Sequence, residues 1–301
     1  MQTGSHTIDL QNQDKIFFPD EKITKGDLID YYSQVSGYLL PFLKDRPLTL
    51  RRFPDGINGD GFYQKEVPDY FPDWIKVTEV KKKEGGTTPQ VICNNKATLI
   101  YLVNQGTLSF HPWLSTADNI SNPNKLVFDL DPPEDDFDLV IKGAKALKQL
   151  LEEKLDLNTF VMTTGSEGLH VISPIKPTHD FEAVHTFAKK TANLLKKQNA
   201  DDFTTEMRKE DRNGRLFIDY LRNSYAQTSI SPYSARALKG APVATPLNWD
   251  ELATKGLTSK SYHIKNIFKR LSQKEDLWTQ FSNKAVDIES RKEQLDNLIT
   301  A

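Results

Sequence analysis

The segment Lys125-Leu-Val-Phe-Asp-Leu-Asp-Pro-Pro133 decides how this chain is interpreted. An apolar run followed by Asp-Leu-Asp and a double proline is typical of a buried strand that ends abruptly. Because side chains alternate across a strand, Asp129 and Asp131 share one face about 6–7 Å apart, and Leu130 faces the other way. Two carboxylates on one face repel each other, and a divalent cation such as Mg²⁺ or Mn²⁺ would remove that cost. Asp-x-Asp alone is also compatible with a solvated strand end or a nucleotide-sugar site.

Composition narrows the class of protein. A chain of 301 residues with 38% hydrophobic content can bury a full core, as one large domain or two lobes. The net charge of −2 does not indicate nucleic-acid binding, so any binding of nucleic acid must come from local basic clusters. The single cysteine, Cys93, excludes an internal disulfide and fits a reducing compartment. Without an apolar run of about 18 residues or a secretory pattern, we expect a soluble, cytoplasmic protein with no membrane contact.

The order of periodic segments predicts an α+β fold with two lobes that meet near residue 120, within a polar loop over 115–124. We therefore divide the chain into a first lobe, 1–120, and a second lobe, 121–301. In the first lobe we expect helices over 25–43 and 95–104, strands over 48–53, 61–65, 75–80, 90–93 and 107–111, and a solvated hairpin tip over 81–86. In the second we expect strands over 126–131, 158–163, 169–174 and 215–220, helices over 136–154, 181–198, 249–254, 263–270 and 276–298, and an irregular stretch over 200–214.

The segment Thr163-Thr-Gly-Ser-Glu-Gly-Leu-His170 lies between two of the expected strands. Its glycines let the backbone turn and approach a ligand closely, and Thr164 and Ser166 add hydroxyl groups. His170 could donate to a phosphate or a sugar. The alternative is a glycine-rich β-turn with a histidine satisfied in the core. The segment is not the Gly-x₄-Gly-Lys-Ser/Thr phosphate loop.

A third strand-end acid, Asp219, stands in Arg215-Leu-Phe-Ile-Asp-Tyr-Leu-Arg-Asn223. Together with Asp129 and Asp131 it could hold two divalent ions about 3.5–4 Å apart for a phosphoryl transfer, with the glycine turn holding a triphosphate. Arg236, in Ser231-Pro-Tyr-Ser-Ala-Arg236, offers a fork that matches phosphate geometry, although a surface arginine in a proline-rich loop is equally compatible.

Cations alternate with aromatic rings in the first lobe, in the segments 14–19, 24–25, 51–53 and 62–65. This combination suits strand phosphates and stacked bases. The alternative is core aromatics with solvated Lys or Arg beside them. His111-Pro-Trp113 is ambiguous, because a histidine beside a buried tryptophan is usually structural.

Taken together in chain order, these segments resemble the polymerase domain of the bacterial multifunctional DNA ligase D, which belongs to the archaeo-eukaryotic primase superfamily. The resemblance runs from about residue 12 to residue 252 and is carried by 17–19, 48–56, 62–65, 111–113, 127–132, 165–170, 217–220 and 232–236. It implies a two-lobed α+β primase-like fold with a mixed β-sheet core and flanking helices. It also implies a template-dependent nucleotidyltransferase that prefers ribonucleotides and fills or extends DNA ends in non-homologous end joining.

The resemblance also implies roles for individual residues. The residues implied to be catalytic and to bind two Mn²⁺ or Mg²⁺ ions are Asp129, Asp131 and Asp219. The residues implied to bind the incoming nucleotide are His111, Thr164, Ser166, Gly168, His170, Arg222, Ser234 and Arg236.

The resemblance also implies DNA contacts. In the first lobe, a recessed 5′-phosphate would be bound by Asn12, Lys15 and Lys25, and the template would stack on Phe62 and Tyr63. The DNA backbone would be contacted by Arg51, Arg52 and Lys65, and by Arg212 from the second lobe.

The implied partners are DNA with gaps, overhangs or 5′-phosphorylated ends, NTPs and dNTPs, and, beyond these, Ku and an ATP-dependent DNA ligase, in a nucleoid-associated setting. The chain departs from the family pattern at Glu167, where Lys or Arg is frequent, at Thr164, where Ser is usual, and at Arg222, where Gln is common. Two rivals remain. One is a primase or primase-polymerase of the same superfamily, although the chain has no zinc-type Cys cluster; the other is a non-catalytic DNA end-bridging module, which would not need the three acids.

Overall fold

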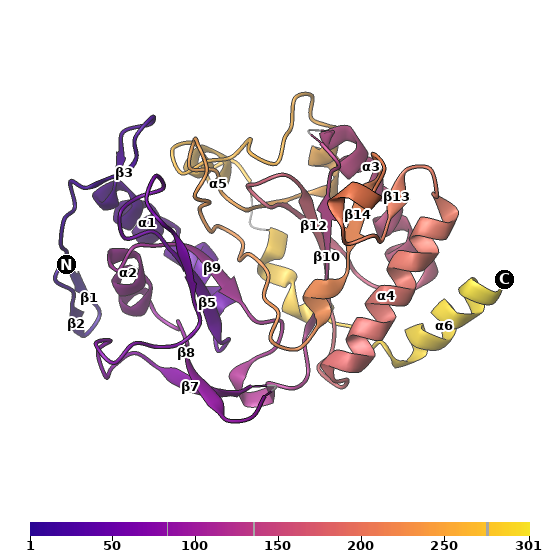
Figure 1. The fold of residues 1–301 in the computed structure, drawn as a ribbon, viewed down its shortest axis with the longest axis horizontal. Helices are drawn as coiled ribbons and strands as arrows, with labels where there is room; N and C mark the ends of the chain where they lie inside the picture. Colours follow the sequence, from indigo (N-terminus) through magenta and orange to yellow (C-terminus); the bar gives the residue numbers. More distant parts are fainter. Residues whose placement is uncertain (83, 135, 275–276) are drawn as a thin grey trace. The chain divides into compact units, whose positions relative to one another are not determined.

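The computed structural model describes residues 1–82, 84–134, 136–274 and 277–301, which form two compact units (Figure 1). Counting only the described residues, the first unit lies within 1–118, 228–244 and 262–274, and the second lies within 119–227, 245–261 and 275–301. The division therefore differs from the predicted one, which placed all of 121–301 in a single lobe. Residues 228–244 join the first unit because their backbone hydrogen bonds are made there: Ala235 N donates to Tyr32 Oη at 2.9 Å, and Val243 N donates to Tyr262 O at 2.8 Å.

The first unit combines helices with small antiparallel sheets. Thr24 begins α1 (Lys25–Leu43), because its side chain accepts from Asp27 N while the Asp27 carboxylate accepts from Thr24 N, a capping box. The predicted helix over 25–43 is thereby confirmed. The other elements are α2 (Lys96–Asn104), a sheet in the order β6 (Phe62–Gln64), β5 (Leu48–Arg52), β9 (Thr107–Pro112), a hairpin of β7 (Val77–Lys81) and β8 (Thr87–Val91), the short α5 (Ile267–Leu271), and the pairs β1 (Gln2–Thr3) with β2 (His6–Thr7) and β3 (Ile16–Phe18) with β4 (Ile23–Thr24).

A six-stranded mixed sheet is the centre of the second unit. Its order is β13 (Phe203–Thr204), β14 (Leu216–Asp219), β10 (Lys125–Asp131), β12 (Leu169–Pro174), β11 (Phe160–Thr163), β15 (Thr245–Leu247), with β13 and β14 parallel and every other pair antiparallel. The mixed sheet agrees with the predicted α+β class. The sequence did not indicate β13 or β15, because strands of two or three residues are too short to show an alternation.

Helices α3 (Phe137–Gln149) and α4 (Phe181–Gln198) cover one face of this sheet (Figure 1). Gly143 of α3 lies directly over the Leu216 side chain, since a Cβ at residue 143 would be 2.2 Å from Leu216 Cδ2. Side chains alternate along β14, so Asp219 points to the opposite face. The α3 helix therefore packs on the face of the sheet opposite to the one that carries the acids. The helix predicted over 136–154 ends in a π turn at Leu150–Lys154.

The helical stretch predicted near 276–298 is confirmed only in its second half; Asp276 lies outside the described residues. Two 3₁₀ turns, Leu277–Gln280 and Ser282–Lys284, precede α6 (Glu289–Thr300). The break has a tertiary cause: Trp278 and Phe281 pack against Phe160, and Val286 bridges Ile175 in an extended conformation. The helices predicted over 249–254 and 263–270 are likewise a 3₁₀ turn at Trp249–Ala253 and the shorter α5.

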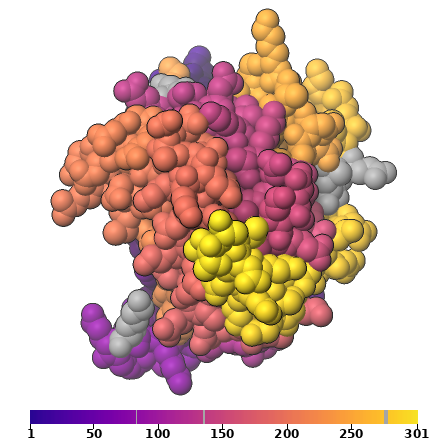
Figure 2. All heavy atoms as spheres, turned by 90° about the vertical axis from the view of Figure 1, so that its right-hand side faces the viewer, coloured from indigo at the N-terminus to yellow at the C-terminus, as the bar shows by residue number. Residues whose placement is uncertain are grey.

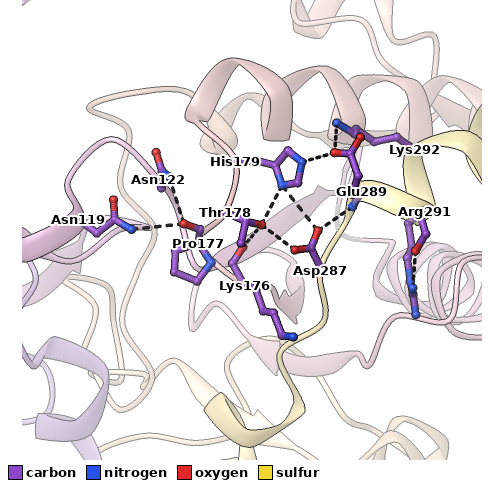
Figure 3. Close-up of polar contacts among 11 residues, drawn as sticks. Asn119, Asn122, Lys176, Pro177, Thr178, His179, Asp287, Glu289, Arg291 and Lys292 are labelled. Carbon is purple, nitrogen blue, oxygen red and sulfur yellow. Dashed lines mark hydrogen bonds and ion pairs between the residues drawn. The ribbon is translucent and has the colours of Figure 1, made fainter.

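The C-terminal segment is tied to the second unit by polar contacts. Thr178 Oγ1 donates to Asp287 Oδ2 at 3.0 Å, and the His179 ring contacts both Asp287 and Glu289 (Figure 3). Lys190 of α4 pairs with Asp296 of α6 at 2.5 Å, and α6 lies against α4 on this face (Figure 2). Across the residues that the structure describes, no helix combines the length and apolar character needed to cross a membrane.

Candidate active site

Asp129 lies at the centre of three neighbouring strands. In the register of the sheet it is directly opposite Asp219 on β14 and His170 on β12, so the three side chains lie at one level on one face. Asp131 follows on the same face of β10. The ligand atoms of Asp129, Asp131 and Asp219 all lie within 4.8 Å of one another. The sheet therefore brings together the three acids that the sequence indicated.

Burial and mutual repulsion make this acid triad unstable as three free carboxylates. Asp129 and Asp219 are only 6% and 7% exposed. Burial, followed by the charges of Asp129 and Asp219, raises the pKa of Asp131 to about 7, and burial with the charge of Asp129 raises the pKa of Asp219. A divalent cation would relieve both costs, and hard carboxylate oxygens are the ligands that Mg²⁺ and Mn²⁺ prefer. The donor set therefore fits such an ion.

Arg222 pairs with the acid triad. Its Nη2 is 3.3 Å from Asp129 Oδ2, and its Nε is 3.6 Å from Asp219 Oδ2. Local backbone geometry brings it there: Asp219 Oδ1 accepts from Leu221 N at 2.7 Å, and a 3₁₀ turn over Leu221–Asn223 carries the arginine back over the strand end. The sequence prediction placed Arg222 at the nucleotide and did not foresee this pairing.

Asn223 holds this turn against the sheet, and the sequence prediction missed it. The residue is fully buried; its Oδ1 accepts from Val127 N at 2.8 Å, and its Nδ2 donates to Val127 O at 2.7 Å and to Tyr220 O at 2.8 Å. The side-chain amide thus bonds the backbone of β10 as a neighbouring strand would. One asparagine in a polar tripeptide after a strand gives no periodic signal, so only the fold reveals its position.

The predicted phosphate turn is closed by Thr164. Its Oγ1 donates to Gly168 O at 3.1 Å and accepts from Ser166 N at 3.2 Å, while Gly165 has a positive φ of 68°. The turn lies against the end of β10, because a Cβ at residue 168 would be 1.8 Å from Leu130 O. Thr164, Ser166 and Gly168 are therefore held beside the residue that precedes Asp131.

His170 is buried in this segment, and Glu167 is exposed. His170 is 3% exposed, its Nε2 is 3.3 Å from Asp129 Oδ1, and its Nδ1 has no hydrogen-bond partner among the described residues. Glu167 is exposed at the turn. The second unit thus brings together, beside the acid triad, the predicted nucleotide residues Thr164, Ser166, Gly168, His170 and Arg222.

The remaining predicted nucleotide residues, His111, Ser234 and Arg236, belong to the first unit. Ser234 is fully buried, and its Oγ accepts from Phe110 N at 3.1 Å, which joins its segment to β9. The His111 ring packs edge-on against the Tyr63 ring, with 5.8 Å between the ring centroids. Arg236 N donates to Pro242 O at 2.8 Å. Contact of these three residues with a nucleotide remains a prediction.

A basic cavity in the first unit gathers the residues predicted to bind a 5′-phosphate. Asn12, Lys15 and Lys25 line a cavity of about 190 Å³. Lys25 is buried and donates from Nζ to Gln11 O at 2.6 Å, and burial, with the charge of Lys15, lowers its pKa. The Lys15 Nζ is 2.5 Å from Asp55 Oδ1. Two lysines and one surface carboxylate, Asp55, give this concave site a net positive charge, which favours the binding of an anion.

Arg52 lines the same cavity but bonds internally. Its Nε and Nη2 donate to Gln105 O at 2.9 and 2.6 Å, and its Nη1 donates to Tyr70 Oη at 2.9 Å. The residue is 6% exposed, and its hydrogen bonds support the cavity wall. Contact of Arg52 with a DNA backbone remains a prediction.

The predicted stacking residues form an exposed aromatic pair on β6, where Phe62 is 45% and Tyr63 61% exposed. The Arg51 guanidinium lies 4.6 Å from the centroid of the Tyr63 ring, and Lys65 is exposed beyond the strand. Large exposed rings with cations beside them suit stacking on nucleobases. In the second unit, the Arg212 guanidinium lies 4.1 Å from the centroid of the Phe217 ring.

Three carboxylates converging on one face of a mixed sheet, beside a hydroxyl- and glycine-lined turn, are the components of a metal-dependent nucleotidyltransferase site. Comparison with known proteins specifies the class further. Residues 24–278 match the family model "LigD, primase-polymerase domain", and the chain belongs to this family of nucleotidyltransferases. The predicted fold and enzyme class are thereby confirmed.

Relatives and solved structures agree. The chain is 35% identical over 268 residues to the bifunctional non-homologous end joining protein LigD of Bacillus subtilis, covering 88% of this chain and 43% of that protein. It is 31% identical to the multifunctional protein LigD of Mycolicibacterium smegmatis, covering 90% and 35%. The polymerase domain of Mycobacterium tuberculosis ligase D, solved in complex with DNA, superimposes with a TM-score of 0.86 at 29% identity over 93% of this chain and 99% of that one. The chain thus spans less than half the length of these curated relatives.

Proposed function

We propose that this protein is a template-dependent polymerase that fills or extends DNA ends in double-strand break repair by non-homologous end joining. The observation that carries the proposal is the acid triad, whose ligand atoms lie within 4.8 Å of one another next to the turn closed by Thr164. Asp129, Asp131 and Asp219 would hold two Mn²⁺ or Mg²⁺ ions, and such ions would supply neutralisation of the charge on the reacting phosphate.

The chain's own residues would position the substrates. Ser166 and the backbone of the Gly165–Gly168 turn are suited to bind the triphosphate, since hydroxyl and amide donors at a tight turn form an anion site. His170 is suited to the sugar or a phosphate, because it is buried beside Asp129 on the neighbouring strand. Catalysis would come from alignment and charge neutralisation rather than from a covalent intermediate.

The decisive experiment is gap filling on one template with matched ribo- and deoxynucleotides, with Mn²⁺ and with Mg²⁺. We expect a higher kcat/KM for ribonucleotides, because a site that hydrogen-bonds a 2′-hydroxyl leaves its buried partners unpaired when that hydroxyl is missing. Glu167 is exposed at the turn and would repel both triphosphates alike, so Glu167→Lys should lower KM for both classes. A deoxynucleotide preference under both metals would refute the sugar assignment, and the absence of all extension would refute the polymerase.

A second prediction concerns the basic cavity of the first unit. Lys15→Gln and Lys25→Gln should weaken binding to gapped DNA about tenfold when the downstream end carries a 5′-phosphate, the loss expected for one charged hydrogen bond. Binding to the unphosphorylated end should change little. Lys22→Gln is the matched control, because Lys22 is an exposed lysine that does not line this cavity. Fluorescence anisotropy measures both affinities; equal losses on both ends would make the two lysines nonspecific backbone contacts.

The extension assay, run with and without a primer, separates the rival functions. A primase of the same superfamily would make products on a template without a primer, and a non-catalytic end-bridging module would bind ends without extending them. The other proposed partners are Ku and an ATP-dependent ligase, which the proposed role in non-homologous end joining would require. A cytoplasmic, nucleoid-associated setting follows from that role and stays part of the proposal.

A further inference from the structure

The Arg222 side chain and a divalent cation would compete for the same two carboxylates. The guanidinium is paired with Asp129 Oδ2 at 3.3 Å and Asp219 Oδ2 at 3.6 Å. These two carboxylates are opposite each other in the β10–β14 register and belong to the group that could hold a metal. A guanidinium beside both Oδ2 atoms keeps an ion from binding them at about 2.0–2.1 Å, the bond length that Mg²⁺ demands, until the guanidinium moves away.

The position of the arginine is built into the fold. The turn that carries it is held at both ends, by the bond from Leu221 N to Asp219 Oδ1 and by the bonds of the buried Asn223 amide to Val127. The side chain itself is 39% exposed, against 9% and 10% for those of Asp129 and Asp219. A fixed backbone with a long, partly solvated side chain allows the guanidinium to leave the acids without rearrangement of the sheet.

We propose that Arg222 is an exchangeable internal cation of the active site: it neutralises Asp129 and Asp219 until a divalent metal displaces its guanidinium, and it thereby sets the metal affinity. The proposal rests on the metal site of the proposed function. It also explains how one arginine can pair with the acids and be available to a nucleotide: the displaced guanidinium is free to contact phosphate. Competition of this kind lowers the apparent metal affinity by the fraction of time that the arginine holds the acids.

The test is Mn²⁺ binding followed by electron paramagnetic resonance of the free ion, a readout independent of catalysis. Arg222→Gln should bind Mn²⁺ at least fivefold more tightly than the parent. Arg222→Lys, which keeps the charge but loses the two-carboxylate fork, should fall between them. Arg215→Gln is the matched control, since Arg215 bonds the backbone oxygens of Arg212 and Asp211 instead of the triad. Its Mn²⁺ affinity should equal that of the parent.

Thermal unfolding adds a second readout with opposite signs. In EDTA, Arg222→Gln should melt below the parent, because the two buried acids Asp129 and Asp219 lose their counter-charge. Saturating Mn²⁺ should then raise its Tm more than it raises that of the parent. Unchanged or weaker Mn²⁺ binding by Arg222→Gln overturns the proposal, as does Arg222→Lys binding like the parent, which would reduce the effect to long-range charge. Failure of the metal site itself is recognised separately, because the parent would then bind no Mn²⁺ that Asp219→Asn abolishes.

Discussion

Asp219→Asn is expected to reduce nucleotide addition by about a thousandfold, equivalent to roughly 4 kcal/mol of lost transition-state stabilisation, and to leave DNA binding largely intact. Asn keeps an oxygen that can accept from Leu221 N, so the turn after β14 should persist. What the substitution removes is one negative ligand directly opposite Asp129. Asp129→Ala should abolish addition for the same reason.

Single-turnover extension of a primed gap measures this loss, and anisotropy on the same DNA measures binding. Asp202→Asn is the matched control, because Asp202 pairs with Lys142 at 2.6 Å and does not belong to the acid triad. It should retain full activity. If Asp219→Asn kept more than a tenth of the parental rate in Mn²⁺ and in Mg²⁺, the acid triad could not be the catalytic metal site.

Gly168→Ala should be the most destabilising small substitution in the phosphate turn. The added Cβ would lie 1.8 Å from Leu130 O and 2.9 Å from Leu130 C, both backbone atoms of a central strand. Neither can move without displacing β10, so we expect a loss of at least about 3 kcal/mol in the free energy of unfolding. Because the same movement shifts Asp131, extension activity should fall as well.

Urea unfolding followed by circular dichroism measures the change, and expression as inclusion bodies would be its extreme form. Gly37→Ala is the control: Gly37 lies exposed within α1, and a Cβ there meets no atom within 4 Å, so this variant should be stabilised by up to about 1 kcal/mol. A Gly168→Ala protein that unfolds at the same urea concentration as the parent would show that the turn does not rest on Leu130.

Local signals in the sequence determined much of the second unit. Helix 181–198 and strand 169–174 were predicted with the bounds that the structure has, because their periodicity is long and their ends carry turn residues. The three acids were predicted from strand alternation and strand ends alone. Their convergence needs only that β10 and β14 pair in register, which places Asp219 opposite Asp129.

Contacts between residues distant in sequence decided the rest. Ser234 and Arg236 were assigned to the catalytic lobe by their place in the chain, yet hydrogen bonds to β9 and Tyr32 place their segment in the first unit. The helix over 276–298 has helical periodicity, but packing of Trp278 against Phe160 interrupts it. Tertiary burial outweighs local propensity at such points.

The sequence by itself determined where the three acids stand, at the ends of two expected strands, because strand alternation and strand ends are local properties of the chain. Only the tertiary structure decided which charges neutralise one another. Arg222 meets Asp129, 93 positions earlier, because Asn223 bonds Val127 and returns the turn over β10. Arg52 donates two hydrogen bonds to the backbone oxygen of Gln105, 53 positions later in the chain. Such pairings depend on which backbone groups the fold leaves unsatisfied, and no short-range pattern records them.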